Sequence, residues 1–130
     1  MNDCPFCNIN NAKDDIVWES KHSIAILDRY PVSTGHTLVI PKRHIKSYFD
    51  LTQDEVDELW DSVKNVKETL DYMYEPDGYN IGINIGEAAG QTIPHCHIHV
   101  IPRYNGDVED PLGGVRSVIP EKRIYINDKQ

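Results

Sequence analysis

The pattern of hydrophobic and polar positions predicts short strands in the first part of the chain. Two runs rich in branched apolar residues, 15–19 and 22–28, read as strands, and a third follows at 36–40. Pro41 ends the third strand, because proline has no amide hydrogen to donate to a sheet. The mixed segment 42–50 is typical of one irregular helical turn.

One long helix is predicted next. Thr52 is followed three residues later by Glu55, which is the spacing of a capping box at a helix start. Beyond it, apolar residues recur at steps of three and four, so a helix of about 20 residues would carry them on one face. This apolar stripe comprises Val56, Leu59, Trp60, Val63, Val66, Leu70 and Met73. Residues 76–78 form a turn that ends the helix.

The second half of the chain returns to strands, at 79–85 and 95–101. The intervening loop, 86–94, is longer than a hairpin needs, and such loops are often functional. We expect one further short strand at 115–119. Together these elements predict a single α+β domain over residues 1–130, built on a five-stranded antiparallel sheet with one long helix and a short helical turn.

Composition narrows the function classes. The 130 residues carry a net charge of −8, which argues against sequence-independent nucleic-acid binding, since that relies on basic surface. No run of about 18 apolar residues exists to span a membrane. The first residues have neither the basic nor the apolar region of a signal peptide. We therefore expect a cytoplasmic protein with reduced thiols, no membrane and no nucleic-acid partner.

Three histidines alternate with apolar residues in the last predicted strand. His95, His97 and His99 share one strand face, because alternate residues of a strand point the same way. A solvent-facing strand rich in histidine is the plain alternative. His95 and His99 are about 13 Å apart at their Cα atoms in an ideal strand, too far to share one metal easily. The row thus predicts metal binding at one end and chemistry further along.

The close pair of Cys4 and Cys7 indicates half of a metal site. With Cys96 the chain has three cysteines, which cannot form a closed set of disulfides. Two thiolates at this spacing can grip one tetrahedral ion, which needs two more ligands. Two reduced cysteines without a metal are the alternative. Cys96 points to the opposite face from the histidines and reads as a small core residue.

Two segments resemble the signatures of the histidine-triad family. Residues 90–101 contain His-x-His-x-His followed by two apolar residues, and residues 35–44 resemble the family's other signature. With Asp28 and the helix between them, the resemblance extends over roughly residues 4–107. It implies a histidine-triad-like fold and an enzyme that acts on nucleotides.

The resemblance also implies a mechanism. His97 would attack the α-phosphorus of a nucleotide, giving a nucleotidyl-histidine that water then hydrolyses. His99 would contact the phosphate and help to protonate the leaving group. His36 would support the surroundings of the nucleophile.

Further residues match binding positions of the family. Asp28 would hold the ribose hydroxyls, although an ordinary turn-initiating aspartate is the alternative. Asn84, Gln91 and Thr92 match positions near the phosphates. Arg29 stands where many relatives carry an apolar residue, so the preferred base stays open.

A structural zinc ion is implied by the same resemblance. His44 and His95 would complete the ligand set of Cys4 and Cys7. Four protein ligands leave no open position, so this zinc would be structural and would tie the N-terminal segment 1–10 to the triad strand.

The predicted function is hydrolysis of dinucleoside polyphosphates such as diadenosine tetraphosphate, because residues 87–92 and 102–107 look more like the fragile-histidine-triad branch. A nucleoside phosphoramidase of the adenosine 5'-phosphoramidate type is the close alternative, and a phosphorylase that uses phosphate as acceptor is a third. A non-catalytic, zinc-stabilised nucleotide-binding module is the alternative from another class, but binding alone needs no nucleophile at His97. Family members pair through the helix and the sheet edge, so a homodimer is expected. The tail, 108–130, matches poorly and leaves the substrate preference open.

Overall fold

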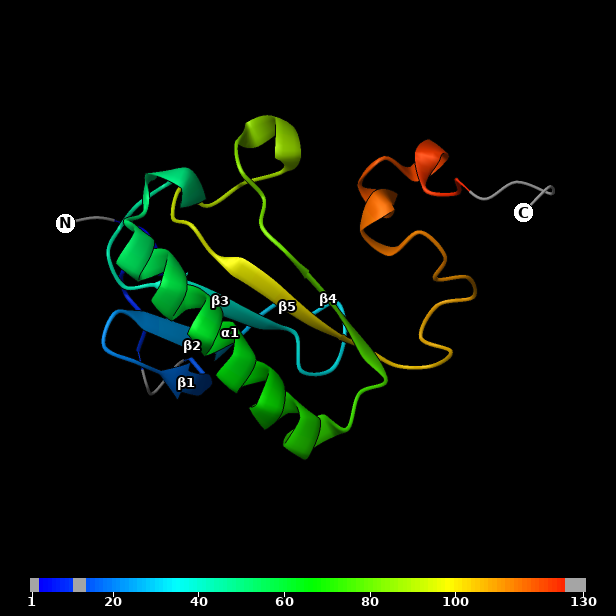
Figure 1. Ribbon diagram of the computed structural model, residues 1–130, viewed down its shortest axis with the longest axis horizontal. Coiled ribbons are helices and arrows are strands. Elements are labelled where there is room, and N and C mark those ends of the chain that lie inside the picture. Colours follow the sequence, from blue (N-terminus) through cyan, green and yellow to red (C-terminus); the bar gives the residue numbers. More distant parts are fainter. Residues whose placement is uncertain (1–2, 11–13, 126–130) are drawn as a thin grey trace.

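Five strands form one antiparallel sheet in the order β1-β2-β3-β5-β4 (Figure 1). We describe residues 3–10 and 14–125 of a computed structural model. The strands are β1 (Ile16–Glu19), β2 (Ser23–Leu27), β3 (Thr37–Pro41), β4 (Gly78–Gly82) and β5 (Ile98–Arg103). The predicted five-stranded antiparallel sheet is confirmed. Parts of the two predicted end segments, residues 1–2 and 126–130, lie outside the described residues.

Helix α1 (Gln53–Tyr74) lies across one face of the sheet (Figure 1). The predicted capping box is present: the Thr52 hydroxyl accepts a hydrogen bond from the Glu55 amide at 3.2 Å, and the Glu55 carboxylate accepts one from the Thr52 amide at 2.9 Å. Both bonds satisfy donors that the first helical turn leaves unpaired. Neither α1 nor any other described helix is both long and apolar enough to cross a membrane.

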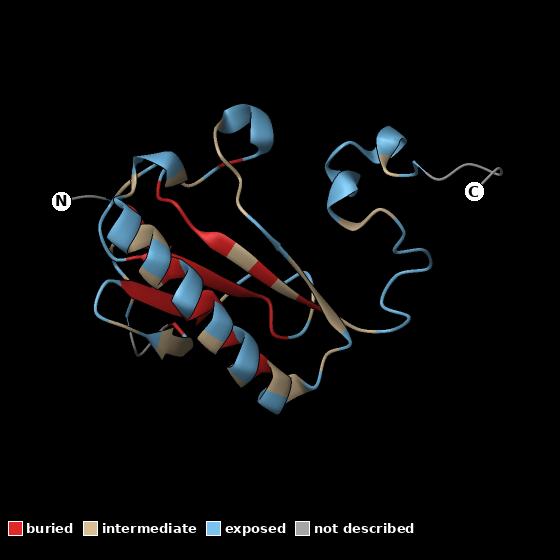
Figure 2. Cartoon of the chain, viewed as in Figure 1, coloured by how far each residue is buried: buried red, intermediate tan, exposed pale blue. Residues whose placement is uncertain are grey.

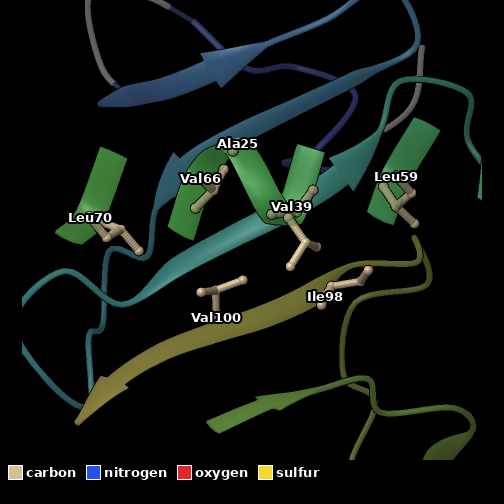
Figure 3. Close-up of a cluster of buried hydrophobic side chains, with 8 residues drawn as sticks. Ala25, Val39, Leu59, Val66, Leu70, Ile98 and Val100 are labelled. Carbon is tan, nitrogen blue, oxygen red and sulfur yellow. The ribbon is translucent and has the colours of Figure 1, made fainter. Parts of the chain in front are cut away.

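The main core lies between α1 and the sheet (Figure 3). It consists of Ala25, Val39, Leu59, Val63, Val66, Leu70, Ile98 and Val100. The predicted apolar stripe is right at its centre and wrong at its edges, because Trp60 and Met73 are 40% and 51% exposed. They flank the strip of the helix that contacts the sheet.

The N-terminal segment covers part of the other face of the sheet. Cys4 and Phe6 pack there in a second apolar cluster with Ile24, Ile26, Leu38 and Ile40. Buried residues therefore run along both β2 and β3 (Figure 2). In β5, Ile98 and Val100 join the main core, so His97 and His99 point to the face covered by the N-terminal segment.

The histidine strand begins later than predicted. Strand β5 starts at Ile98, whereas the sequence pattern placed the start at His95. The ladder stops where Ile98 pairs with Val39. Two residues further along β3, the carbonyl of Pro41 accepts a hydrogen bond from the His95 ring instead. At this end of the ladder the His95 side chain, and not a backbone amide, is thus the partner of a β3 carbonyl.

Two other predicted elements differ from the structure, and one is confirmed. Residues 115–119 do not form a strand but lie mostly in the 3-10 helix η3 (Gly114–Val118), because the backbone closes three-residue bonds from Arg116 to Gly113 and from Ile119 to Arg116. Strand β4 ends at Gly82 rather than at residue 85. The irregular turn predicted at 42–50 is confirmed as η1 (Tyr48–Asp50), and two short turns, η2 (Glu87–Ala89) and η4 (Pro120–Lys122), complete the described elements.

Truncation of Leu70 tests the main core. Leu70 is fully buried between α1 and the sheet, so Leu70→Ala should lower the free energy of unfolding by about 2–5 kcal/mol through lost burial and a cavity. Urea unfolding followed by circular dichroism measures this. Leu112→Ala is the matched control, since Leu112 is 42% exposed and its truncation should change stability by no more than about 0.5 kcal/mol. Equal losses in the two variants would contradict this placement of the core.

Candidate active site

Two groups of metal-ligating side chains lie near the start of β5. One brings together Cys4, Cys7, His44 and His95, whose ligand atoms all lie within 4.8 Å of one another. The other consists of Asp28, His36 and His99, within the same limit. His95 and His99 therefore serve different groups, as the distance between them in an extended strand suggested.

The first group has the dimensions of a tetrahedral site. For Zn–N bonds near 2.0–2.1 Å and Zn–S bonds near 2.3 Å, the edges of a tetrahedron are about 3.3 Å between two nitrogens and about 3.6 Å between nitrogen and sulfur. The Nδ1 atoms of His44 and His95 are 3.2 Å apart. Sγ of Cys7 lies 3.1 Å from Nδ1 of His44 and 3.5 Å from Nδ1 of His95, and Sγ of Cys4 lies 3.3 Å from the latter. These residues fit a tetrahedral metal.

His95 presents the correct nitrogen to such a metal. Its Nε2–H donates to the carbonyl oxygen of Pro41 at 2.8 Å, so Nδ1 carries the free lone pair that a ligand needs. A backbone partner on the second nitrogen is the usual way in which proteins fix a metal-binding imidazole. The ring is fully buried, and burial lowers the pKa of His95, which keeps it neutral.

His97 is held in the opposite sense. Its Nδ1–H donates to the backbone carbonyl of His95 at 2.9 Å, which leaves the lone pair on Nε2. The ring lies between two others, with centroid distances of 5.0 Å both to Phe6 and to His99. An imidazole with a fixed orientation and a lone pair on Nε2 has the form required of a nucleophile.

His36 and His99 form a chain of hydrogen bonds beside His97. The amide of Val32 donates to Nδ1 of His36 at 3.1 Å, so the proton of His36 is on Nε2. That Nε2–H faces Nδ1 of His99 at 3.0 Å and the Asp28 carboxylate at 3.5 Å. Donation to His99 leaves the proton of His99 on its own Nε2. His99 can therefore act as a donor at the site.

The same bonds argue against a metal in the second group. A metal on Nε2 of His36 would require a proton on Nδ1, where the Val32 amide already points its hydrogen. Burial lowers the pKa of His36, and burial together with the neighbouring His97 and His36 rings lowers the pKa of His99 to about 4. Both rings are neutral near pH 7, which suits hydrogen bonding to an anionic ligand by a neutral donor.

A pocket of about 450 Å³ opens in front of these rings. Its apolar lining includes Phe6, Ile26 and Leu38, and its polar lining includes Asp28, Asn84, Thr92, His97 and His99. One oxygen of Asp28 accepts the Tyr30 amide at 3.0 Å. The pocket thus combines apolar side chains with a carboxylate that lies next to the histidines.

Gln91 does not line this pocket. It is buried, and its amide binds backbone: the side-chain oxygen accepts from the Gly86 amide at 2.9 Å, and the nitrogen donates to the carbonyls of Lys46 and Ile93. In these contacts it shapes the loop 86–94. Gly86 and Gly90 in that loop both have φ near +90°. Glycine adopts this backbone conformation without the steric cost that other residues incur.

Phe6 and Arg29 line the pocket but were not among the predicted site residues. Phe6 contacts the rings of both His95 and His97, and Arg29 lines the pocket while its guanidinium pairs with Asp14 at 3.1 Å. The position of Phe6 could have been inferred, since a residue between Cys4 and Cys7 must lie near any third ligand of the same metal. No signal in the sequence joined Arg29 to Asp14.

Comparisons with known proteins identify the family to which this chain is similar. A family model described as the HIT domain matches residues 10–106. An uncharacterized HIT-like protein of Methanocaldococcus jannaschii is 43% identical over 110 residues, covering 82% of this chain and 83% of that protein. The asymmetrical bis(5'-nucleosyl)-tetraphosphatase of Schizosaccharomyces pombe is 38% identical over 95 residues, covering 73% of this chain and 52% of that protein.

A solved structure shares the fold. The crystal structure of a Zn-bound histidine triad family protein from Mycobacterium smegmatis superposes with a TM-score of 0.73 at 37% identity, covering 81% of this chain and 78% of that one. The sheet and helix described above are thus those of a known architecture.

The low pKa of His99 predicts a pH-dependent stability. As the pH falls from 6.5 to about 4, the unfolded chain takes up a proton on this residue that the folded protein does not bind, so stability is lost over that range. His99→Asn should reduce this loss by roughly 1–2 kcal/mol, because the ring is partly solvated and the full shift is not realised. Urea unfolding across the range measures it. His22→Asn, at an exposed histidine outside the site, is the control. An unchanged slope in the His99 variant would refute the assignment.

Proposed function

The chain belongs to the HIT family, and from that premise we propose that it is a nucleotide hydrolase that cleaves dinucleoside polyphosphates at the α-phosphate. The observation that carries the proposal is the 2.9 Å bond from Nδ1–H of His97 to the carbonyl of His95, which leaves Nε2 free at the pocket. The name of the S. pombe relative supports this substrate class.

In the proposed reaction, Nε2 of His97 forms a bond to the α-phosphorus and the bond from phosphorus to the bridging oxygen breaks. The leaving phosphate oxygen takes that electron pair and departs as an anion, to which Nε2–H of the neutral His99 ring donates a hydrogen bond. Water then attacks the phosphorus, the phosphorus–nitrogen bond breaks, and a nucleoside monophosphate is released. Two steps with a good imidazole leaving group replace one difficult displacement.

The binding roles follow from the sides of the pocket. Asp28 accepts hydrogen bonds from the ribose hydroxyls, a task suited to a carboxylate. Asn84 and Thr92, on the polar side with the histidines, donate to phosphate oxygens. Gln91 acts near the phosphates through the loop 86–94, which its amide holds in shape. His36 keeps the proton of His99 on the nitrogen that serves the leaving group.

The metal group has a structural role in this proposal. Zinc is the ion that prefers two thiolates and two imidazoles in a tetrahedron, and the M. smegmatis structure is described as Zn-bound. Cys4, Cys7, His44 and His95 supply all four bonds, so the ion has no open position for substrate.

The protein further pairs as a homodimer through α1 and the edge of the sheet, and acts in the cytoplasm.

Replacement of His97 tests the nucleophile. His97→Ala should lower kcat for diadenosine tetraphosphate at least about 10³-fold, as loss of a nucleophile does, while AMP binding measured by calorimetry persists. In ¹⁸O water the wild-type protein should put the label into AMP and not into ATP. His22→Ala, at an exposed histidine away from the site, should keep wild-type turnover. Full activity of His97→Ala would end the catalytic proposal, and preferred turnover of adenosine 5'-phosphoramidate would favour the phosphoramidase alternative.

Metal analysis tests the zinc site. Protein purified under reducing conditions without chelator should contain stoichiometric zinc, and Cys4→Ser should lose most of it, because one of the four ligands is gone. Cys96→Ala should retain the metal, since Cys96 is a buried core residue outside the group. Elemental mass spectrometry measures the content. Wild-type protein without metal would remove the zinc proposal.

A further inference from the structure

Phe6 links the metal group to the proposed nucleophile. It lies between Cys4 and Cys7 in the chain and is 8% exposed. Its ring meets His97 edge to face, with centroids 5.0 Å apart and planes at 66°, and also meets His95 at 5.8 Å. One aromatic side chain therefore touches both a metal-ligating histidine and the ring that attacks phosphorus.

The same loop forms part of the nucleotide pocket. Pro5 and Phe6 both line the cavity that holds Asp28 and His99. Because Phe6 lines the pocket and contacts the His97 ring, its removal would widen the pocket next to His97. It would also remove a contact that limits movement of the His97 ring. The loop thus contacts the site of the substrate although its cysteines serve the metal.

We infer that residues 4–7 form a metal-dependent wall of the nucleotide site, in which Phe6 is a positioning residue for His97. This inference rests on the proposed function. Metal bonds at Cys4 and Cys7 restrain both ends of the short loop, so they hold the Phe6 ring against His97. The ion described above as structural then also controls how well the pocket binds and orients a nucleotide.

Hydrogen bonds and apolar packing also restrain the loop. The Cys7 amide donates to the Cys4 carbonyl at 3.2 Å, and the Asn8 side chain donates to the same carbonyl at 2.8 Å. Among the described residues, the His97 ring makes one hydrogen bond, from Nδ1 to the His95 carbonyl. Rotation of the ring about the axis of this bond would leave the bond intact. Phe6 on one side and His99 on the other limit that tilt. An edge-to-face aromatic pair favours this geometry beyond its burial.

Variants at Phe6 test the positioning role. Phe6→Ala removes both the wall and the ring, whereas Phe6→Leu keeps apolar volume but loses the edge-to-face contact. Ile24→Ala is the matched control, because Ile24 lies in the same apolar cluster and is equally buried, yet does not line the pocket. For each protein, calorimetry gives the Kd for AMP, kinetics with diadenosine tetraphosphate give kcat and KM separately, and elemental analysis gives the zinc content.

A split between binding and turnover is expected. Phe6→Ala should raise the Kd for AMP and lower kcat, each by about tenfold, the factor that corresponds to about one lost aromatic contact. Phe6→Leu should restore the Kd to within about threefold of wild type but leave kcat reduced. Zinc content and the Ile24→Ala kinetics should match the wild type. If Phe6→Ala behaves like Ile24→Ala in both Kd and kcat, Phe6 has no positioning role.

Chelation tests the dependence on metal. Removing the metal should weaken AMP binding by the wild type about tenfold, but by less than about threefold in Phe6→Ala, because the two changes act on one wall and are not additive. Equal weakening in both proteins would overturn the metal-dependent wall. A wild-type protein that neither binds AMP nor turns over substrate would instead overturn the proposed function. An active wild type with unaffected Phe6 variants would overturn this inference alone.

Discussion

The backbone carbonyl of His95 sets the chemistry of the site, because it fixes which nitrogen of His97 carries the proton. A free imidazole exchanges between two tautomers, and only the one with a bare Nε2 presents a lone pair to the pocket. The carbonyl at 2.9 Å selects that tautomer. Its own position depends on the His95 side chain, which is fixed by Pro41 and by the metal-ligating group.

Neutral histidines recur throughout the site for a common reason. Each ring has one nitrogen occupied by backbone or by another ring, and burial lowers the pKa of His36, His95 and His99. For His99 the resulting pKa is about 4. The hydrogen bonds from Val32 to His36 and on to His99 therefore deliver a defined donor to the pocket without placing a fixed positive charge there. This arrangement suits a protein whose net charge of −8 provides no general attraction for nucleotides.

Along the segment that contains β5, core residues alternate with pocket residues, so the two kinds of side chain lie on opposite faces of the sheet. Ile98 and Val100 pack under α1, while His97 and His99 face the side covered by the N-terminal segment. That segment has no strand of its own among the described residues and is held by Cys4, Cys7 and the packing of Phe6. The pocket is thus built partly from this segment and partly from the sheet, which keeps the histidines in register.

The sequence by itself determined the elements whose signals are local. The capping box at Thr52, the apolar spacing of α1 and the alternation around His97 each depend on neighbours in the chain, so the helix, the strands and the shared face of the triad could be read directly. The resemblance to the histidine-triad signatures added His44 to the two cysteines, which spacing alone could not do.

Tertiary structure decided what depends on partners distant in sequence. Strand β5 starts at Ile98 because the ring of His95, and not a backbone amide, donates to the Pro41 carbonyl beyond the ladder, and residues 115–119 lie mostly in a 3-10 helix. Gln91 binds backbone, and Phe6 reaches His97, only because loops far apart in the chain meet at one edge of the sheet. Local sequence patterns determine on which side of a strand or helix a residue lies. The atoms that it contacts there depend on packing between segments that are distant in sequence.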